Sequence, residues 1–309
     1  MIQPRPSSLY FAAPPAAAGH GLLAIGEALI DILTTDFVGD LSQVTTLRAM
    51  AGGSPANLCR FVQDCGGTAR LVAAVGQDGL GEILLRTLAA AGLSTEHIHQ
   101  LPDRATSIIV VGRSRDTPTF IPYRSADRHL PPVEPALVLD AAVVHTTAFA
   151  LSRLPAQDHI LAALATATAH GRQVSVDWNY AAPIWRRSNN APAVWQQLLS
   201  YQPLLKVSLD DVARFSGGPA TVEAAQAFLH AVPARVLCLT CGADGVWYRG
   251  AGGLWQHQSA PAVTVHDATG AGDAFWAGFL TRWMQHRPLD ECVQLGIQTA
   301  ARRLQGQLA

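Results

Sequence analysis

Apolar runs alternate along the chain with stretches of helical periodicity. Short runs of aliphatic and β-branched residues, each with the length of a buried strand, recur at 71–75, 108–112, 142–146, 174–177, 204–208, 236–240 and 245–248. The clearest helix between them is predicted from Pro155 to His170, because Pro155 suits a first helical turn and Gly171 suits a C-terminal cap. This alternation predicts a mostly parallel sheet with helices on both faces.

The N-terminal half departs from this rhythm in three places. Residues 1–20 are rich in Pro, Ala and Ser without the apolar centre of a signal peptide, so a disordered tail is expected before a single domain at 21–309. The first strand is expected within 21–33, GLLAIGEALIDIL, leaving the sheet at the polar break of Gly26 and Glu27. Segments 34–51 and 105–130 carry short β-type runs without clear helices, and we interpret them as a small β lid.

Composition excludes several classes of protein. Hydrophobic residues make up 49% of the chain and charged residues 15%, which suffices for a sizeable core. A formal net charge of −1 gives no sign of a nucleic-acid or membrane partner, and no apolar run reaches the ~18–20 residues of a membrane span. The 5 cysteines form no regular framework, which favours a reducing, cytoplasmic location.

Two features bear on nucleotide, metal or redox chemistry. Lys206 is the only lysine, and it stands in the segment LLKVS without the Gly-rich turn of a Walker A loop. ATP, if it is bound, is therefore bound without a P-loop lysine. Cys238 and Cys241 form a Cys-x-x-Cys pair, which could bind a metal or be redox-active. Since no second Cys/His pair has zinc spacing, a buried strand residue followed by a turn residue is the favoured interpretation.

The sharpest chemical signal is DATGAGD at 267–273, followed by AFWAGFLTRWMQ. Apolar side chains of the second segment fall on one helical stripe, so the segment from Gly270 to Asp273 is predicted to be a turn that leads into a helix. Such a turn presents unpaired N–H groups and the positive end of the helix dipole. Its glycines allow a ligand to approach the backbone closely. Gly270, Ala271 and Gly272 therefore predict a phosphate site.

Asp273 is unexpected in this turn, since a carboxylate repels a phosphate unless it has another task. One interpretation is a general base, which accepts a proton from a hydroxyl as the oxygen attacks the γ-phosphate of ATP. The other is a helix-capping residue, a position where Asp is common. The complete DATGAGD pattern before an apolar helix favours the base.

This segment resembles the C-terminal signature of the ribokinase/PfkB carbohydrate kinases, usually Asp-Thr-x-Gly-Ala-Gly-Asp. AGGSPAN at 51–57 resembles the family's Gly-Gly-x-x-x-Asn segment, in a Ser-Pro variant similar to fructokinases, and GEALIDIL at 26–33 resembles its first strand. The similarity runs from about 21 to about 299. It implies a ribokinase-like three-layer α/β/α sandwich, with a mostly parallel central sheet and a small β lid, in an enzyme that uses ATP and Mg²⁺.

The resemblance also implies roles for individual residues. Asp31, Gly52, Gly53 and Asn57 match positions that bind the sugar, and a carboxylate and an amide can together hold vicinal hydroxyls. The alternative is that they are ordinary residues of a strand end and a tight turn. Arg124, in the predicted lid, and Asn179, after a central strand where α/β proteins place ligands, are further candidates for contact with the sugar.

The nucleotide side of the family's site is matched less closely. Thr240, Gly242 and Gly245 resemble its Thr-x-Gly-x-x-Gly turn beside the ATP phosphates, although a plain hairpin turn explains them equally well. Ser208 and Asp211 stand where relatives have Asn-x-x-Glu, which organises Mg²⁺ and its waters. Aspartate keeps the carboxylate but has a shorter reach.

Two departures from the family bear on ligands. Relatives that bind acidic sugars often carry an arginine where this chain has Ala181, so a neutral sugar is expected. Asp267 matches the Asp that helps to bind a monovalent cation in relatives. The Gly-containing loop that completes their cation site is not matched by the segment LQGQLA, which puts activation by K⁺ in doubt.

The expected reaction is in-line transfer from ATP to a primary hydroxyl of a small sugar, most simply fructose, with Asp273 as the base. One alternative is another acceptor, namely ribose, a nucleoside or 2-keto-3-deoxygluconate. A second is a sensor that kept the fold without catalysis, which the replaced Asn-x-x-Glu leaves open and the intact GAGD at 270–273 disfavours. A Rossmann dehydrogenase is disfavoured, because the spacing of Gly76, Gly79 and Gly81 does not fit its loop. By analogy with relatives, a homodimer through the lid is expected.

Overall fold

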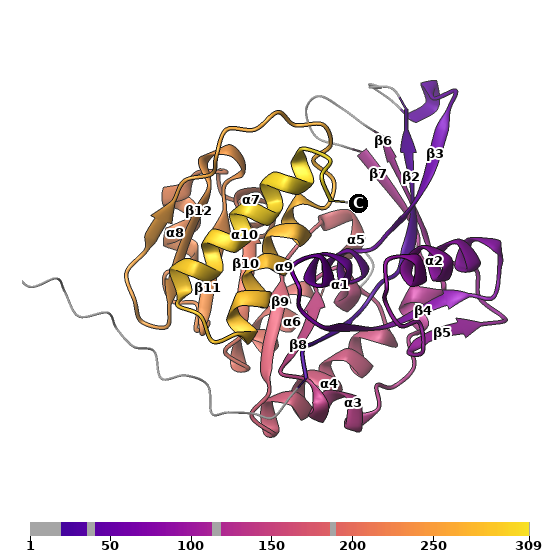
Figure 1. Cartoon of the computed structure of the whole chain (residues 1–309), viewed down its shortest axis with the longest axis horizontal. Coiled ribbons are helices and arrows are strands. Elements are labelled where there is room, and N and C mark those ends of the chain that lie inside the picture. Colours follow the sequence, from indigo (N-terminus) through magenta and orange to yellow (C-terminus); the bar gives the residue numbers. More distant parts are fainter. Residues whose placement is uncertain (1–19, 36–40, 113–118, 186–189, 309) are drawn as a thin grey trace, which may run out of the picture.

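The computed structural model describes residues 20–35, 41–112, 119–185 and 190–308. Nearly all of the predicted N-terminal tail lies outside these ranges. The described residues form a large sheet between two layers of helices, and a smaller sheet stands at one side, at the upper right of Figure 1. This arrangement confirms the predicted three-layer α/β/α fold with a small β lid.

The large sheet explains the alternating pattern of the sequence. Its strand order is β13 (Gln256–Gln258), β12 (Val246–Gly250), β11 (Val236–Thr240), β10 (Leu204–Ser208), β9 (Gln173–Asp177), β8 (Val143–Thr147), β1 (Leu22–Ile25), β4 (Ala69–Gly76) and β5 (Ile98–Leu101). Neighbours from β5 to β11 are parallel, and β12 and β13 are added antiparallel. Parallel neighbours place their carboxyl ends at one edge of the sheet, where α/β proteins bind ligands.

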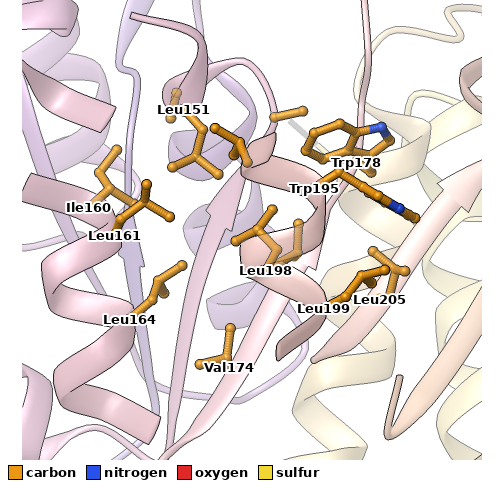
Figure 2. Packing of buried hydrophobic residues seen from close by; sticks show 14 of the residues in the cluster. Leu151, Ile160, Leu161, Leu164, Val174, Trp178, Trp195, Leu198, Leu199 and Leu205 are labelled. Carbon is orange, nitrogen blue, oxygen red and sulfur yellow. The ribbon is translucent and has the colours of Figure 1, made fainter. Parts of the chain in front are cut away.

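One face of the sheet is covered by α3 (Pro135–Asp140), α4 (Ala156–Ala169), α5 (Ala182–Trp185), α6 (Ala191–Ser200), α7 (Leu209–Ser216) and α8 (Val222–Leu229). Figure 2 shows this cluster, with side chains from α4, α6 and β9 directed toward one another. The opposite face is covered by α1 (Ser54–Asp64), α2 (Gly79–Ala90), α9 (Ala271–Met284) and α10 (Leu289–Leu304). Alternate residues of β1 face the two clusters, as a strand buried on both sides requires.

The predicted helix at 155–170 is confirmed as α4, and it ends before Gly171, whose φ of +69° is the left-handed value typical of a helix C-terminal cap. The first strand expected within 21–33 is β1 (Leu22–Ile25), and it leaves the large sheet at Gly26 and Glu27 as expected. Residues 29–34 then form a second strand in another sheet, which the sequence did not predict. Gly26 must be small, since a Cβ at this position would lie 2.8 Å from Pro55 Cγ.

The second strand, β2 (Leu29–Thr34), belongs to a four-stranded sheet that we call the lid sheet, in the order β3 (Leu47–Gly52), β2, β6 (Ile108–Gly112) and β7 (Thr119–Tyr123). Its strands come from the two segments that the sequence assigned to a lid, together with the residues that follow the end of the first strand. Gly52 is the last residue of β3, and Gly53 alone connects this strand to α1. The lid sheet and the large sheet therefore meet beside the start of α1.

Candidate active site

The starts of α1 and α9 face each other. Gly270 precedes α9 in the left-handed conformation, with φ of +76°, and Asp273 lies in the first turn of the helix. Asp273 Oδ1 accepts a hydrogen bond of 2.6 Å from Ser54 Oγ, and Oδ2 accepts one of 3.0 Å from Asn57 Nδ2. The glycine turn, the base predicted from the sequence and Asn57 are therefore brought together.

Ser54 is a site residue to which the sequence analysis gave no role. Ser54 and Asn57 are three residues apart, so both side chains lie on the same face of α1. Their spacing within AGGSPAN was the feature of the sequence that could have identified Ser54 as a partner of Asn57 in the site. The pKa of Asp273 is raised by burial, although Ser54, Lys206, Asn57 and Arg303 each act to lower it. The carboxylate is thus held in one orientation and protonates more readily than an exposed aspartate.

Asp31 reaches the same site from the lid sheet. Burial, and then the nearby charge of Asp273, raises the pKa of Asp31 to about 7. A Cβ on Gly52 would lie 2.0 Å from Asp31 Oδ2, so the carboxylate occupies the space that any side chain at position 52 would need. Gly52 is therefore required by close packing rather than by turn geometry.

Gly53 and Glu27 form a second close contact. Gly53 has φ of +103°, and a Cβ there would lie 2.4 Å from the Glu27 carbonyl oxygen. Glu27 is buried; its Oε1 accepts a bond of 3.2 Å from the Ser54 N–H, and its Oε2 accepts one of 3.0 Å from Thr147 Oγ1. Burial raises the pKa of Glu27 to about 8. Glu27 thus supports the start of α1, and the sequence showed it only as a charge within an apolar run.

A cleft opens between the lid sheet and the two facing helices. It is lined by Asp31, Leu33, Met50, Ala51, Asn57, Arg60, Phe61, Thr269, Gly270 and Arg303. Two guanidinium groups therefore accompany Asp31 at this cleft. The pKa of Arg60 is lowered by burial and further by the charge of Arg303, against the attraction of Asp64, so the two arginines are electrostatic neighbours.

The residues predicted to bind the nucleotide lie at the carboxyl ends of adjacent strands. Ser208 and Thr240 are paired in the register of β10 and β11. Ser208 and Asp211 form a capping box at α7, in which Ser208 Oγ accepts from the Asp211 N–H at 3.1 Å and Asp211 Oδ2 accepts from the Ser208 N–H at 3.0 Å. Burial raises the pKa of Asp211 to about 6. The pair thus caps the N-terminus of α7. A role for it beside Mg²⁺ stays a prediction.

Gly242 and Gly245 form the turn between β11 and β12, with φ of +58° and +88°. A Cβ on Gly245 would lie 2.2 Å from the carbonyl oxygen of Gln258, the last residue of β13, so this glycine is required by the close approach of the neighbouring strand. Cys238 lies in β11 and Cys241 in the turn that follows, as the structural interpretation of the Cys-x-x-Cys predicted. Contact of this turn with ATP stays a prediction.

Arg124 is held within the protein. Its Nε donates to Asp127 Oδ2 at 2.7 Å and its Nη1 to the Phe149 carbonyl oxygen at 3.0 Å, and its side chain is 4% exposed. Asn179 Oδ1 accepts from the Phe149 N–H at 3.2 Å and so joins the segments that follow β8 and β9. These hydrogen bonds of Arg124 and Asn179 are made to other residues of the protein. Contact of either residue with a sugar stays a prediction.

Asp267 has a protein cation as its partner. Asp267 Oδ2 accepts a bond of 2.8 Å from Arg303 Nη2 of α10, and its Oδ1 accepts one of 2.9 Å from the Thr269 N–H. These contacts lower the pKa of Asp267 in spite of partial burial. An arginine therefore already neutralises the carboxylate that the resemblance assigned to a monovalent cation.

Two further findings concern metal ions and membranes. Within the described ranges, no group of three or more His, Cys, Asp or Glu side chains is arranged to hold a metal ion. Among the helices described by the structure, none is long and apolar enough to cross a membrane. This edge of the sheet thus carries a glycine turn at the start of a helix, a carboxylate held by two donors and a cleft beside the lid sheet.

Comparisons with known proteins agree with this geometry. The family model described as pfkB family carbohydrate kinase matches residues 20–308. An ATP-dependent 6-phosphofructokinase of Thermoanaerobacterium thermosaccharolyticum is 30% identical over 287 residues, covering 92% of this chain and 88% of that protein. The structure of Halothermothrix orenii fructokinase matches with a TM-score of 0.80 at 29% identity, covering 91% of this chain and 98% of the other.

A fructokinase of Xylella fastidiosa with bound ATP matches with a TM-score of 0.76 at 26% identity, over 92% of this chain and 91% of the other. The fold and the site together define a sugar kinase of ribokinase-like architecture. The chain belongs to the pfkB family of carbohydrate kinases.

Proposed function

We propose that this kinase transfers the γ-phosphoryl group of ATP to a primary hydroxyl of fructose or a similar neutral sugar, with Asp273 as the general base. The observation that carries the proposal is the Asp273 carboxylate, held by Ser54 and Asn57 beside the glycine turn at the start of α9. The similarity to two fructokinases, one of them with bound ATP, supports both the acceptor and the donor.

In the proposed reaction, ATP binds with its γ-phosphate on the backbone N–H groups of residues 270–273, at the positive end of α9. The sugar lies in the cleft, held by Asp31, Asn57 and the backbone at Gly52 and Gly53. Asp273 accepts the proton of the attacking hydroxyl, a bond forms between that oxygen and the γ-phosphorus, and the bond to ADP breaks in line. Closure of the lid sheet excludes water, which would otherwise compete as the acceptor.

Mg²⁺ is proposed to enter as the complex with ATP. The described residues contain no preformed metal cage, which fits an ion held mainly by phosphates and water with one carboxylate nearby. Asp211, in the first turn of α7 after β10, is the residue that would hold its water shell. The ion would neutralise charge on the phosphates, while the chain itself supplies the turn, the base and the cleft.

ADP release from Mg-ATP tests the proposal, with fructose, ribose, 2-keto-3-deoxygluconate and adenosine offered separately. We expect turnover with fructose and little with the others. Turnover with a different acceptor would replace fructose but keep the mechanism. A folded protein that binds ATP and fructose in calorimetry without turnover would instead identify a sensor and contradict the proposal.

A second acceptor, a ketohexose phosphate, is favoured by one observation. Arg60 and Arg303 both line the cleft beside Asp31, and guanidinium groups are well suited to bind phosphate. The 30% identical 6-phosphofructokinase supports the same class. Fructose 6-phosphate therefore belongs in the panel, with Arg60→Gln as the variant. Loss of turnover for the phosphate ester but not for fructose would assign Arg60 to the ester.

The proposed homodimer would form through the lid sheet. Its edge strands β3 and β7 expose Leu47, Ile121 and Tyr123, which are 50%, 43% and 57% exposed. Exposed apolar side chains on edge strands are typical of a surface that a partner covers. Light scattering after gel filtration is expected to show a dimer that Tyr123→Glu dissociates, and a monomeric wild type would contradict this.

The 5 unpaired cysteines support the proposed cytoplasmic location.

A further inference from the structure

Lys206 is a buried charge with no assigned task. The residue is 5% exposed, in the middle of the large sheet. Its Nζ donates to Asp177 Oδ1 at 3.1 Å and to Asp177 Oδ2 at 2.9 Å, and the two residues are opposite each other in parallel strands β10 and β9. Stability alone does not call for such a pair, since well-packed apolar residues of similar volume often serve as well or better.

The ammonium group lies against the phosphate-binding turn. A Cβ built on Gly272 would lie 2.8 Å from Lys206 Nζ, so a glycine at position 272 is what allows this approach. The ammonium carries three N–H groups. Two of them are donated to Asp177, and no acceptor among the described residues bonds to the third. A charge with unused donor capacity therefore lies next to the turn.

Charged groups reach this point from several elements. Burial lowers the pKa of Lys206, but Asp177, Asp211 and Asp273 outweigh it and raise the pKa, so the ammonium stays protonated. Lys206 in turn acts to lower the pKa of Asp273. The groups that face Asp273 are Ser54 and Asn57 of α1, Asp31 of β2, Asp177 of β9, Lys206 of β10 and Arg303 of α10.

We propose that Lys206 is the phosphate-site lysine of this kinase, supplied from strand β10 rather than from a Walker A loop, and that Asp177 is the residue that positions it. The ammonium would stabilise the negative charge that develops on the transferring phosphoryl group. The inference rests on the proposed function, because it takes a phosphoryl group as the ligand of the turn.

The experiment compares Lys206→Met, Asp177→Asn and the double variant Asp177→Asn/Lys206→Met with the wild type. The double variant removes both charges and so avoids leaving a buried carboxylate unpaired. Affinity for Mg-AMP-PNP is measured by calorimetry without a sugar, and kcat is measured with the best acceptor of the panel. We expect the double variant to fold, to bind the nucleotide more weakly and to lose ~10²–10³-fold in kcat.

Arg249→Met is the matched control. Arg249 is also a buried cation of the large sheet, 6% exposed, but its guanidinium donates to the carbonyl oxygens of Leu229, His230 and Val232. Its loss should lower the melting temperature and leave nucleotide affinity unchanged. A folded double variant with wild-type affinity and kcat would overturn the role of Lys206.

The pH profile separates this role from a structural one. Lys206→Met should move the acidic limb of kcat/KM to higher pH, because the charge that favours ionised Asp273 is lost. Asp177→Asn should move it to lower pH, because a repelling carboxylate is lost. A packing defect would leave the acidic limb of kcat/KM in place in both variants. If the wild type phosphorylates no acceptor, the proposed function fails, and the calorimetric result still decides the role of Lys206 at the nucleotide.

Discussion

Asn57 Nδ2 lies 3.0 Å from Asp273 Oδ2, a contact between residues 216 positions apart in the sequence. With the 2.6 Å bond from Ser54 Oγ, it gives each oxygen of the carboxylate a donor. A carboxylate has about four acceptor positions, so lone pairs remain for a substrate proton. The two motifs that identify the family are therefore the two halves of one hydrogen-bonded unit.

The role of Asp273 as base is tested by Asp273→Asn. The amide keeps the volume and one oxygen for Ser54, but it does not accept a proton at working pH. We expect kcat to fall by ~10²–10⁴-fold with nucleotide affinity and melting temperature nearly unchanged. Ser54→Ala is the control, since it removes one orienting bond and leaves the carboxylate; its loss in kcat should be smaller. Near-normal turnover in Asp273→Asn would exclude the base role.

The pH dependence of activity follows from two raised pKa values. Burial raises the pKa of Asp273, and burial together with Asp273 raises that of Asp31 to about 7. Because the base acts in its ionised form, kcat/KM should fall as pH drops, starting at a higher pH than for an exposed aspartate. Asp31→Asn should move this limb to lower pH, since one repelling charge is removed. A limb that Asp31→Asn leaves in place would show that the two carboxylates are not coupled.

Glu27 predicts a pH dependence of stability. Burial raises the pKa of its folded state from the ordinary value of 4.5 to about 8. Between these values the unfolded chain has lost the proton that the folded chain keeps, so the contribution of Glu27 to stability falls as pH rises through this window. Melting temperatures at pH 5 and pH 8 should therefore differ less in Glu27→Gln than in the wild type. An equal difference in both proteins would exclude the raised pKa.

The cleft has no room for a side chain at position 52. A Cβ there would lie 2.0 Å from Asp31 Oδ2, so Gly52→Ala must displace the carboxylate. We expect a higher KM for the sugar and a smaller change for ATP. Gly79→Ala is the matched control, because Gly79 starts α2 without a positive φ and nothing lies within 4 Å of its Cβ position. Steady-state kinetics with sugar and ATP varied separately decide the matter.

The Asp267–Arg303 pair predicts a response to monovalent cations. Because Arg303 Nη2 lies 2.8 Å from Asp267 Oδ2, the carboxylate has its counter-charge without an added ion. ADP release should therefore be the same in K⁺, in Na⁺ and in tetramethylammonium. Arg303→Gln, which frees the carboxylate, should lower activity in tetramethylammonium and recover part of it in K⁺. Strong K⁺ activation of the wild type would contradict this account of Asp267.

Much of the fold was predictable from local patterns. Buried parallel strands are apolar runs of characteristic length, and α4 was bounded by residues with clear preferences at helix ends. The end of the first strand at Gly26 and Glu27 was visible in the sequence, but the second strand that follows it, and the sheet that this strand joins, were not. What separates β1 from β2 is pairing with different sheets, and those partners lie far away in the sequence.

The sequence by itself determined the family, and it located the glycine turn and the candidate base, since each depends on short-range spacing and backbone freedom at glycine. Only the tertiary structure decided what the isolated charges do. Glu27, Lys206 and Asp267 look alike as single charged residues, yet one supports the start of α1, one pairs with Asp177 beneath the turn and one pairs with Arg303. The effect of a charge depends on its distance to other charges and on its burial, and both are set by contacts between distant segments.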